Sequence, residues 1–308
     1  MSSMESVANS AEVLEVRPSL WSIWFQAIRP RTLTAAFAPV GVGAGVALAE
    51  GTFQWVPVVV ALIGATMIQI GTNLANDYFD FKKGADTADR LGPARVTQKG
   101  WVSPTEVARA TWTAFGLAVV AGAYLVAVAG MPVVWIGVAS ILSGVLYTGG
   151  PWPLGYLGLG DLFVFVFFGP VAVCGTYFVQ AGSVSKGAIL ASIPVGLLAT
   201  AILVVNNLRD RHTDVLANKR TLAVRFGAAF ARAEYVCLVL GAYAVLLFLV
   251  VALAYPAGWL LPLGTFPLAV LEIKAIYSLD GAALNPHLGG AARLGMLFGL
   301  LLAIGMSL

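Results

Sequence analysis

Residues 110–160 contain no Asp, Glu, Lys or Arg, and most side chains in this stretch are apolar or small. A helix that crosses a bilayer needs about 20 consecutive apolar residues, so the stretch has room for more than one such helix. Over the whole chain 59% of residues are hydrophobic and 11% are charged, whereas roughly a quarter are charged in soluble globular proteins. The sequence therefore predicts a polytopic, all-α membrane protein.

The apolar segments and the turn residues between them predict nine membrane spans. The polar segment 1–20 has no apolar core, so we expect a disordered cytoplasmic tail ahead of one transmembrane domain over 21–308. Two connections, 81–103 and 209–230, are long and charged and are expected to form loops that cap the domain. The predicted spans cover residues 25–49, 55–80, 104–128, 131–148, 161–180, 187–208, 231–253, 257–277 and 288–307.

The basic residues predict the orientation, because cytoplasmic loops collect Lys and Arg. With the N-terminus inside, both long loops and the 278–287 connection lie on the cytoplasmic side, and of 18 Lys and Arg only Lys186 lies near an outer turn. Nine spans then place the C-terminus outside. The net charge of +3 is too small to indicate nucleic acid as a partner.

Two predicted helices end in Asn- and Asp-rich sequence on the same side of the membrane. The second span ends in GTNLANDYFDFKKGAD and the sixth in VVNNLRDRHTD, each followed by a basic segment. Asn76 and Asn206 lie 130 residues apart, which indicates a pseudo-duplicated core whose two motifs face one another across a cavity. Within each motif the spacing places the polar side chains along one helix face.

Acidic groups repeated on consecutive helical turns repel one another, and at a membrane they are costly unless they hold a partner. These motifs offer oxygen donors without a His or Cys cluster, a set that favours Mg²⁺ over softer metals. Nearby Lys and Arg side chains suit a multiply charged phosphate. The simpler alternative, loop salt bridges and topology signals without a ligand, stays open at this point. The predicted metal ligands are Asn76, Asp77, Asp80, Asp86, Asn206, Asp210 and Asp214.

The same stretches resemble the UbiA superfamily of intramembrane aromatic prenyltransferases. The resemblance covers residues 29–230, through RPRTLTAAFAPVGVG, NLANDYFDFKKGADTADRLGPARVTQKG, YTGGPWPLGYLGLGDLFVFVFFG and NNLRDRHTDVLANKRTLAVRFG. It implies that a prenyl diphosphate binds between the two motifs through Mg²⁺, with Asp77, Asp80, Asp210 and Asp214 as catalytic residues. Further substrate-binding residues that it implies are Asn73, Arg95, Lys99, Tyr147, Asn207, Lys219, Arg220, Arg29 and Arg31.

Two departures bear on the acceptor that the resemblance implies. Many members carry a further Asp where this chain has Gly84, and Asp86 follows two residues later, as in the branch that acts on 1,4-dihydroxy-2-naphthoate. Members that act on 4-hydroxybenzoate have a Lys four residues after the Tyr, where this chain has Pro151 after Tyr147. The implied reaction is therefore polyprenyl transfer to 1,4-dihydroxy-2-naphthoate, with loss of CO₂ and diphosphate.

Two alternatives to this function remain at the level of sequence. The acceptor is another aromatic ring, such as 4-hydroxybenzoate or homogentisate, or the chain is an ion-coupled secondary transporter. Transporters place their carboxylates near the midplane, whereas these lie at helix ends beside basic loops. Asp161, at the start of the fifth predicted span, has two interpretations: a ligand for a ring hydroxyl, or a helix N-cap.

Overall fold

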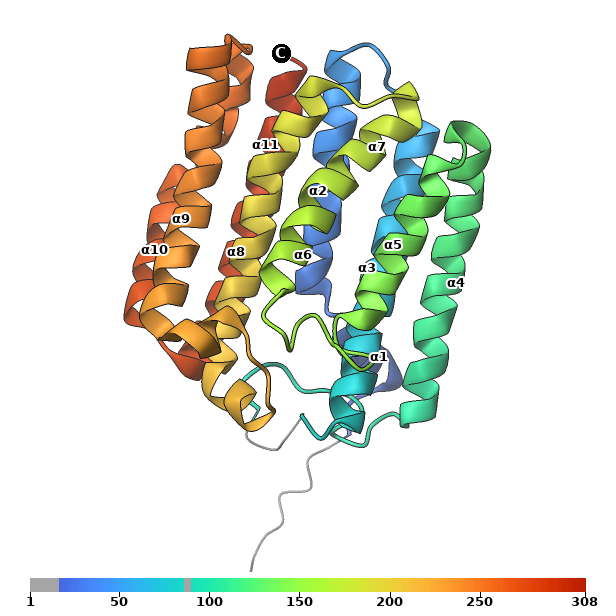
Figure 1. The fold of residues 1–308 in the computed structure, drawn as a ribbon, viewed down its shortest axis with the longest axis vertical. Helices are drawn as coiled ribbons and strands as arrows, with labels where there is room; N and C mark the ends of the chain where they lie inside the picture. Colours follow the sequence, from blue (N-terminus) through green and yellow to red (C-terminus); the bar gives the residue numbers. More distant parts are fainter. Residues whose placement is uncertain (1–16, 86–89) are drawn as a thin grey trace, which may run out of the picture.

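The computed structural model describes residues 17–85 and 90–308, and within them the chain forms helices and no strand, as the sequence predicts. Residues 1–16 of the predicted tail lie outside the described residues, and so does Asp86. Figure 1 shows the long helices running side by side, with α1 and the connections that follow α3 and α8 at one end, and the C-terminus at the other. The elements are α1 (Leu20–Ile28), α2 (Pro30–Ala49), α3 (Trp55–Lys82), α4 (Pro104–Ala129), α5 (Pro132–Leu146), α6 (Gly160–Val166), the π-helical η1 (Phe167–Val171), α7 (Ala172–Ala181), α8 (Lys186–Leu216), α9 (Leu222–Leu253), the 3₁₀ helix η2 (Ala257–Thr265), α10 (Phe266–Ser278), η3 (Gly281–Leu284) and α11 (Asn285–Met306).

Eight helical segments of the described chain are long and apolar enough to cross a membrane. They correspond to eight of the nine predicted spans, and α6, η1 and α7 together form one of them. The ninth, predicted over 131–148, is α5, whose 15 residues extend about 22 Å at 1.5 Å per residue. This is shorter than the roughly 30 Å hydrocarbon core, so α5 alone does not meet the length of a span.

The first predicted span is broken near its start. Arg29 adopts a left-handed conformation (φ 54°) between α1 and α2, and Pro30 occupies the first position of α2. Proline suits that position because its ring fixes φ and its missing N–H needs no partner there, while it disfavours helix in the preceding residue. The chain therefore turns at Arg29, and α1 is a separate short helix.

The prediction of a loop over 209–230 is wrong for most of this range. Helix α8 continues to Leu216, and α9 begins at Leu222, where the Thr221 hydroxyl accepts a hydrogen bond from the Val224 amide. The charged residues of α8 are accommodated because they pair with one another and with neighbouring segments. Gly227 (φ 83°) interrupts the helical geometry of α9 near its start. Only the five residues 217–221 connect the two helices.

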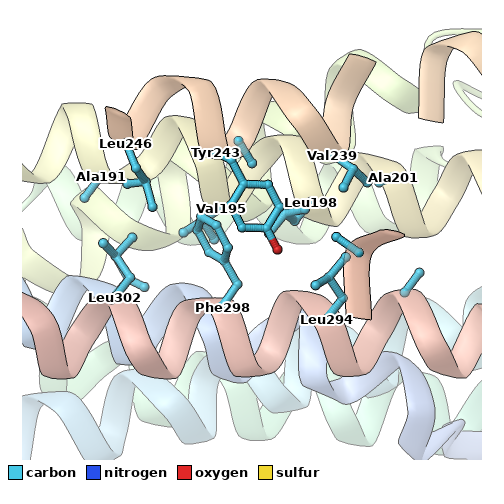
Figure 2. Packing of buried hydrophobic residues seen from close by; sticks show 14 of the residues in the cluster. Ala191, Val195, Leu198, Ala201, Val239, Tyr243, Leu246, Leu294, Phe298 and Leu302 are labelled. Atoms are coloured by element: carbon cyan, nitrogen blue, oxygen red, sulfur yellow. The ribbon is translucent and has the colours of Figure 1, made fainter. Parts of the chain in front are cut away.

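Helices α8, α9 and α11 pack into the main apolar core. Figure 2 shows Val195 and Leu198 of α8 meeting Tyr243 of α9 and Phe298 of α11. The Tyr243 and Phe298 rings meet edge to face with centroids 5.4 Å apart. In lipid such helix contacts rest on close van der Waals packing rather than on the expulsion of water. This half of the bundle is therefore a packed scaffold.

The other half of the bundle contains a cavity of about 230 Å³, lined by residues of α2 to α7 and η1. Along α3 the lining runs from Ala61 to Thr72, a distance of about 16 Å at 1.5 Å per residue. Most of the other lining side chains are aliphatic or aromatic, and Tyr147 also contributes. Because Thr72, Asn76 and Asp80 follow at i, i+4 and i+8, the polar motif of α3 continues the cavity-lining face toward the end where the connections gather.

Candidate active site

The first polar motif occupies the last turns of α3. Asn73, Asp77 and Asp80 are 4% or less exposed, and Asn76 is half-buried. Buried carboxylates require hydrogen-bond donors or counter-ions, since an isolated buried charge is very costly. The partners of each side chain therefore show what the motif does in this structure.

Asp80 is the centre of a polar network at this end of the bundle. One carboxylate oxygen, Oδ2, accepts hydrogen bonds from Arg95 (2.9 Å) and from Lys219 (3.2 Å), and the other, Oδ1, accepts one from the Tyr156 hydroxyl (2.7 Å). These partners come from the α3–α4 connection, the α8–α9 connection and the α5–α6 connection. Asp80 thus joins three segments that are far apart in the sequence.

Asp77 and Asn73 bind backbone groups. The two oxygens of the Asp77 carboxylate accept hydrogen bonds from the amides of Val96 (3.1 Å) and Thr97 (3.3 Å). The Asn73 amide donates to the Ile28 carbonyl and to the Thr32 hydroxyl, both at 2.9 Å. Asp77 therefore fixes the turn that carries Arg95, and Asn73 fixes the corner between α1 and α2.

The Tyr156 ring contacts two cations. The Lys83 ammonium is 4.7 Å from the centroid of the Tyr156 ring and the Lys219 ammonium is 4.9 Å from it, within the range of cation–π attraction. Lys83 also donates to the Thr148 carbonyl (2.6 Å), and the Thr148 hydroxyl donates to Asn76 (2.8 Å). Partial desolvation lowers the pKa of the Lys83 ammonium; the charge of Asp80 opposes this shift and that of Lys219 adds to it.

The second motif lies on α8 and is organised by Arg209, whose side chain is 1% exposed. Its guanidinium donates to both oxygens of Asp210 (2.8 and 2.5 Å), to Asn206 (2.8 Å) and to Asn285 (3.1 Å). A Cβ added to Gly92 would lie 2.7 Å from this guanidinium, so the α3–α4 connection packs directly on it. The arginine neutralises Asp210 and ties α8 to α11 and to that connection.

Asp214 differs from Asp77, Asp80 and Asp210 in that its carboxylate has no hydrogen-bond partner among the described residues. It is 8% exposed, and among the described residues its carboxylate accepts no hydrogen bond. The charges of Lys219, Asp210, Asp80 and Arg90 act on it. The structure thus brings Asp80, Asp210 and Asp214 to one region, and Asp214 is the carboxylate open to a further partner.

The donor set suits a hard cation, although the described residues contain no group of three acidic, His or Cys side chains arranged to hold a metal by themselves. Mg²⁺ is commonly held by one or two carboxylates, with waters and substrate phosphates completing its shell. The open carboxylate of Asp214, facing Asp80 and Asp210, fits that role. Asn76 supplies an amide oxygen nearby, and Asn206 offers another that already accepts from Arg209.

Tyr147 connects this polar region to the cavity. Its side chain lines the cavity, and a Cβ added to Gly160 would lie 2.8 Å from its hydroxyl. The charges of Asp161, Asp214 and Asp80 act on that hydroxyl. Tyr147 is therefore close to both polar motifs and to the start of α6.

The remaining predicted substrate-binding residues differ in how far their side chains are exposed to solvent. Arg95 and Asn207 are buried at the site, whereas the side chains of Arg31, Lys99 and Arg220 are exposed and Arg29 is half-buried. Arg220 contacts the site through its backbone, because its amide donates to the Tyr156 carbonyl (2.9 Å).

Sequence reasoning missed Tyr156, Thr148 and Asn285. The first two lie in the YTGGPWPLGYLGLGD stretch, where Gly and Pro mark a turn that returns to the motif. That pattern could have indicated a loop over the site. Asn285 precedes Pro286 at the start of α11, in a segment without other acidic or amide neighbours in sequence except Asp280, so nothing there pointed to the site.

The solved structures similar to this chain include two archaeal membrane proteins. A UbiA homologue from Aeropyrum pernix K1 is 16% identical with a TM-score of 0.67, and covers 90% of this chain and 97% of its own. A UbiA homologue from Archaeoglobus fulgidus bound to DMAPP and Mg²⁺ is 13% identical with a TM-score of 0.62, and covers 91% and 99%. At these identities the likeness shows a shared fold.

Similarity to curated sequences is higher. The chain is 39% identical to the 1,4-dihydroxy-2-naphthoate octaprenyltransferase of Escherichia coli (strain K12) over 92% of this chain and 95% of the relative. It is 31% identical to the protein of the same name from Bacillus subtilis (strain 168), over 94% of both. Residues 36–285 match the family described as the UbiA prenyltransferase family. With an all-helical bundle, a family match over most of its length and relatives above 30% identity, the chain belongs to the UbiA prenyltransferase family.

Proposed function

We propose that this protein transfers a polyprenyl group from a prenyl diphosphate to 1,4-dihydroxy-2-naphthoate and releases diphosphate and CO₂. In the net reaction the allylic C–O bond and the bond between ring and carboxylate break, and a ring–prenyl C–C bond forms. The product is demethylmenaquinol. The observation that carries the proposal is the pairing of the Asp80 network with an adjoining apolar cavity, in a chain whose relatives carry this activity in their names.

The polar region suits a diphosphate head group. Arg95 and Lys219 already bind a carboxylate oxygen of Asp80 and lie where anionic phosphate oxygens would attract them. We propose Asn76, Asp80, Asn206, Asp210 and Asp214 as the residues that hold Mg²⁺. When bound, Mg²⁺ neutralises the diphosphate and makes it a better leaving group. Asp77 is left out of this set because both of its oxygens accept from backbone amides, those of Val96 and Thr97, whereas the partners of Asp80 and Asp210 are side chains that can rearrange around an ion.

The cavity suits the prenyl chain. Its lining is mainly aliphatic and aromatic, it starts beside Tyr147 and Thr72, and it runs along α3 away from the polar motif. The allylic carbon would then lie near Tyr147, whose ring face can stabilise a developing cation. An apolar enclosure also keeps water away from that cation until the aromatic ring attacks.

We further propose that this end of the bundle faces the cytoplasm. The connections that follow α3 and α8 lie with α1 at the end opposite the C-terminus (Figure 1), and they carry Arg95 and Lys219 among other basic residues. Cytoplasmic segments collect Lys and Arg, so the N-terminus lies inside and the C-terminus outside. A periplasm-active alkaline phosphatase fused after Leu308 should be active, and an inactive fusion would reverse this orientation.

The acceptor is tested by product analysis. Purified protein in lipid nanodiscs is supplied with a prenyl diphosphate and, separately, with 1,4-dihydroxy-2-naphthoate, 4-hydroxybenzoate or homogentisate. We expect mass spectrometry to find a prenylated, decarboxylated naphthalenediol with the first acceptor alone. Turnover with either of the others in its place would keep the family chemistry and refute the assigned acceptor.

A further inference from the structure

Asp161 is a buried acid whose carboxylate has no hydrogen-bond partner on another of the described residues. It is the second residue of α6 and is 8% exposed, and neither carboxylate oxygen accepts a hydrogen bond from another described residue. It does not cap its helix, since Leu159 is the N-cap residue and no side chain caps there. Buried polar groups without a partner are rare and require an explanation, and an acidic residue inside a membrane helix usually marks a functional site.

The position of Asp161 relates it to the cavity. On α6 it lies one turn from Val164, which lines the cavity together with Phe163. The preceding residue, Gly160, is against the Tyr147 hydroxyl, which also lines the cavity. Asp161 does not itself line the cavity; it lies beside the end that adjoins the polar motifs, between Tyr147 and the helices α8 and α9 that carry its neighbours Thr200 and Glu234.

The surroundings of Asp161 contain acids and hydroxyls. Glu234 of α9 interacts with it through charge, and the Thr200 hydroxyl donates to its backbone carbonyl at 3.5 Å. Tyr147 is the third polar neighbour. No Lys or Arg of the described chain forms an ion pair with the carboxylate. The missing partner is therefore a hydrogen-bond donor that carries no negative charge at the point of contact.

Among the substrates of the proposed reaction only one meets this requirement. The prenyl chain is a hydrocarbon without a donor, and the diphosphate is an anion that the carboxylate would repel. The aromatic acceptor carries ring hydroxyls, and a hydroxyl bonded to a carboxylate forms a short, charge-assisted hydrogen bond.

We propose that Asp161 accepts a hydrogen bond from a ring hydroxyl of the aromatic acceptor and so holds the acceptor ring beside Tyr147. This inference rests on the proposed function and adds to it the residue that selects hydroxylated acceptors. This hydrogen bond also orients the acceptor ring toward the diphosphate site, because Tyr147 is near Asp80 and Asp214 as well as near Asp161. The ring is thereby placed next to the carbon that leaves the diphosphate.

The experiment measures acceptor binding directly, without turnover. Radiolabelled 1,4-dihydroxy-2-naphthoate is titrated under reducing conditions onto wild type, Asp161→Leu and Asp161→Asn in nanodiscs, and an unreactive prenyl thiolodiphosphate is titrated in parallel. Glu272→Gln is the matched control, because Glu272 is also a buried acid in a membrane helix but is paired with His287 (2.8 Å) outside the cavity.

Losing a hydrogen bond to a charged group weakens binding by about 10- to 100-fold. We expect Asp161→Leu to weaken acceptor binding by about that factor, and Asp161→Asn, which keeps one acceptor oxygen, to weaken it less. Binding of the thiolodiphosphate should be unchanged in both, and Glu272→Gln should bind both ligands as wild type does. Wild type should also prefer the free diol over its two monomethyl ethers, and Asp161→Leu should lose the preference for one of them.

Wild-type acceptor binding by Asp161→Leu, or equal loss of both ligands, would overturn the inference. If Asp161→Leu does not fold, the same comparison of diol and methyl ethers on Asp161→Asn decides it. Failure of the proposed function has a different signature, namely that wild type itself neither binds nor prenylates 1,4-dihydroxy-2-naphthoate. In that case the titrations are repeated with the hydroxylated acceptor that wild type does use, and the same outcomes apply.

Discussion

The Lys219 ammonium lies 3.2 Å from the Asp80 carboxylate, although the two residues are 139 positions apart in the sequence. Lys219 follows the second polar motif and Asp80 ends the first, so this contact joins the two halves of the site. Tyr156 reinforces it, because its hydroxyl donates to Asp80 and its ring faces the Lys219 ammonium. The site is therefore one network built from three connections, and its predicted properties follow from that arrangement.

Replacing Lys219 should weaken binding of the diphosphate more than it slows the chemical step. Lys219→Gln removes a positive charge that both pairs with Asp80 and faces the open carboxylate of Asp214. We expect the KM for prenyl diphosphate to rise about 10-fold, the scale of a lost hydrogen bond to a charged group, with the KM for the acceptor unchanged. Steady-state kinetics with each substrate varied in turn measure this. Lys186→Gln, an exposed lysine at the other end of α8, is the control, and an equal effect there would contradict the assignment.

Replacing Asp77 should loosen the turn that its carboxylate holds. Asp77→Asn keeps one acceptor oxygen for the Val96 and Thr97 amides and loses the other. Hydrogen–deuterium exchange should show faster exchange of these two amides, and the thermal midpoint should fall by the equivalent of about 1–3 kcal/mol.

Activity of Asp77→Asn should decline because Arg95 is displaced, while the Mg²⁺ concentration for half-maximal activity stays as in wild type. A large rise in that concentration with unchanged amide exchange would instead make Asp77 a metal ligand, as the sequence analysis predicts.

A pH dependence is expected at the exposed ion pair between Arg211 and Asp280. The hydrogen bond from Arg211 lowers the pKa of the Asp280 carboxyl below its usual value. A carboxyl with a lowered folded-state pKa stabilises the protein above its unfolded pKa of about 3.9, and the contribution is lost as the pH falls through the folded-state pKa. The Asp280 side chain is 45% exposed, so solvent keeps the effect below about 1 kcal/mol.

Thermal midpoints of wild type and Asp280→Asn from pH 7 to pH 2.5 test this directly. The gap between the two proteins should be constant down to about pH 4.5 and close below that. A gap that widens on acidification would contradict the predicted lowering of the Asp280 pKa in the folded protein. Arg211→Gln should behave as Asp280→Asn does, because either change removes the same pair.

Filling the cavity should reduce the use of long prenyl diphosphates more than the use of short ones. Gly137 of α5 lines the cavity, and a Cβ there has no neighbour within 4 Å, so Gly137→Leu adds volume without a clash at its first atom. We expect turnover of a long polyprenyl diphosphate to fall well below that of wild type, while a five- or ten-carbon donor is still used. Competition assays with mixed donors measure the ratio. Gly116→Leu is the control, since Gly116 is equally unobstructed but exposed and outside the cavity; an unchanged ratio for Gly137→Leu would place the prenyl chain elsewhere.

The sequence predicts the fold class and the two motifs well, because apolar runs and the spacing of Asn and Asp are local properties. It fails where the chain departs from local rules. The break at Arg29 depends on a left-handed residue next to Pro30, and the continuation of α8 through Arg209 and Asp214 depends on partners from Asn285 and Gly92 that no local pattern reveals. Tyr156 was missed for the same reason, since its role arises from the return of the α5–α6 connection onto Asp80.

In the proposed site the two motifs together hold a single prenyl diphosphate with Mg²⁺. This arrangement is tested most directly by prenyl transfer to 1,4-dihydroxy-2-naphthoate in nanodiscs, with Mg²⁺ or with a chelator, for wild type, Asp80→Asn, Asp210→Asn and the control Lys186→Gln. We expect wild type and Lys186→Gln to form product with Mg²⁺ and not with chelator. Each aspartate variant should fall by about 100-fold or more, the usual scale for losing a group that stabilises developing charge. Full activity in chelator, or loss in one aspartate variant and wild-type activity in the other, would contradict a shared site.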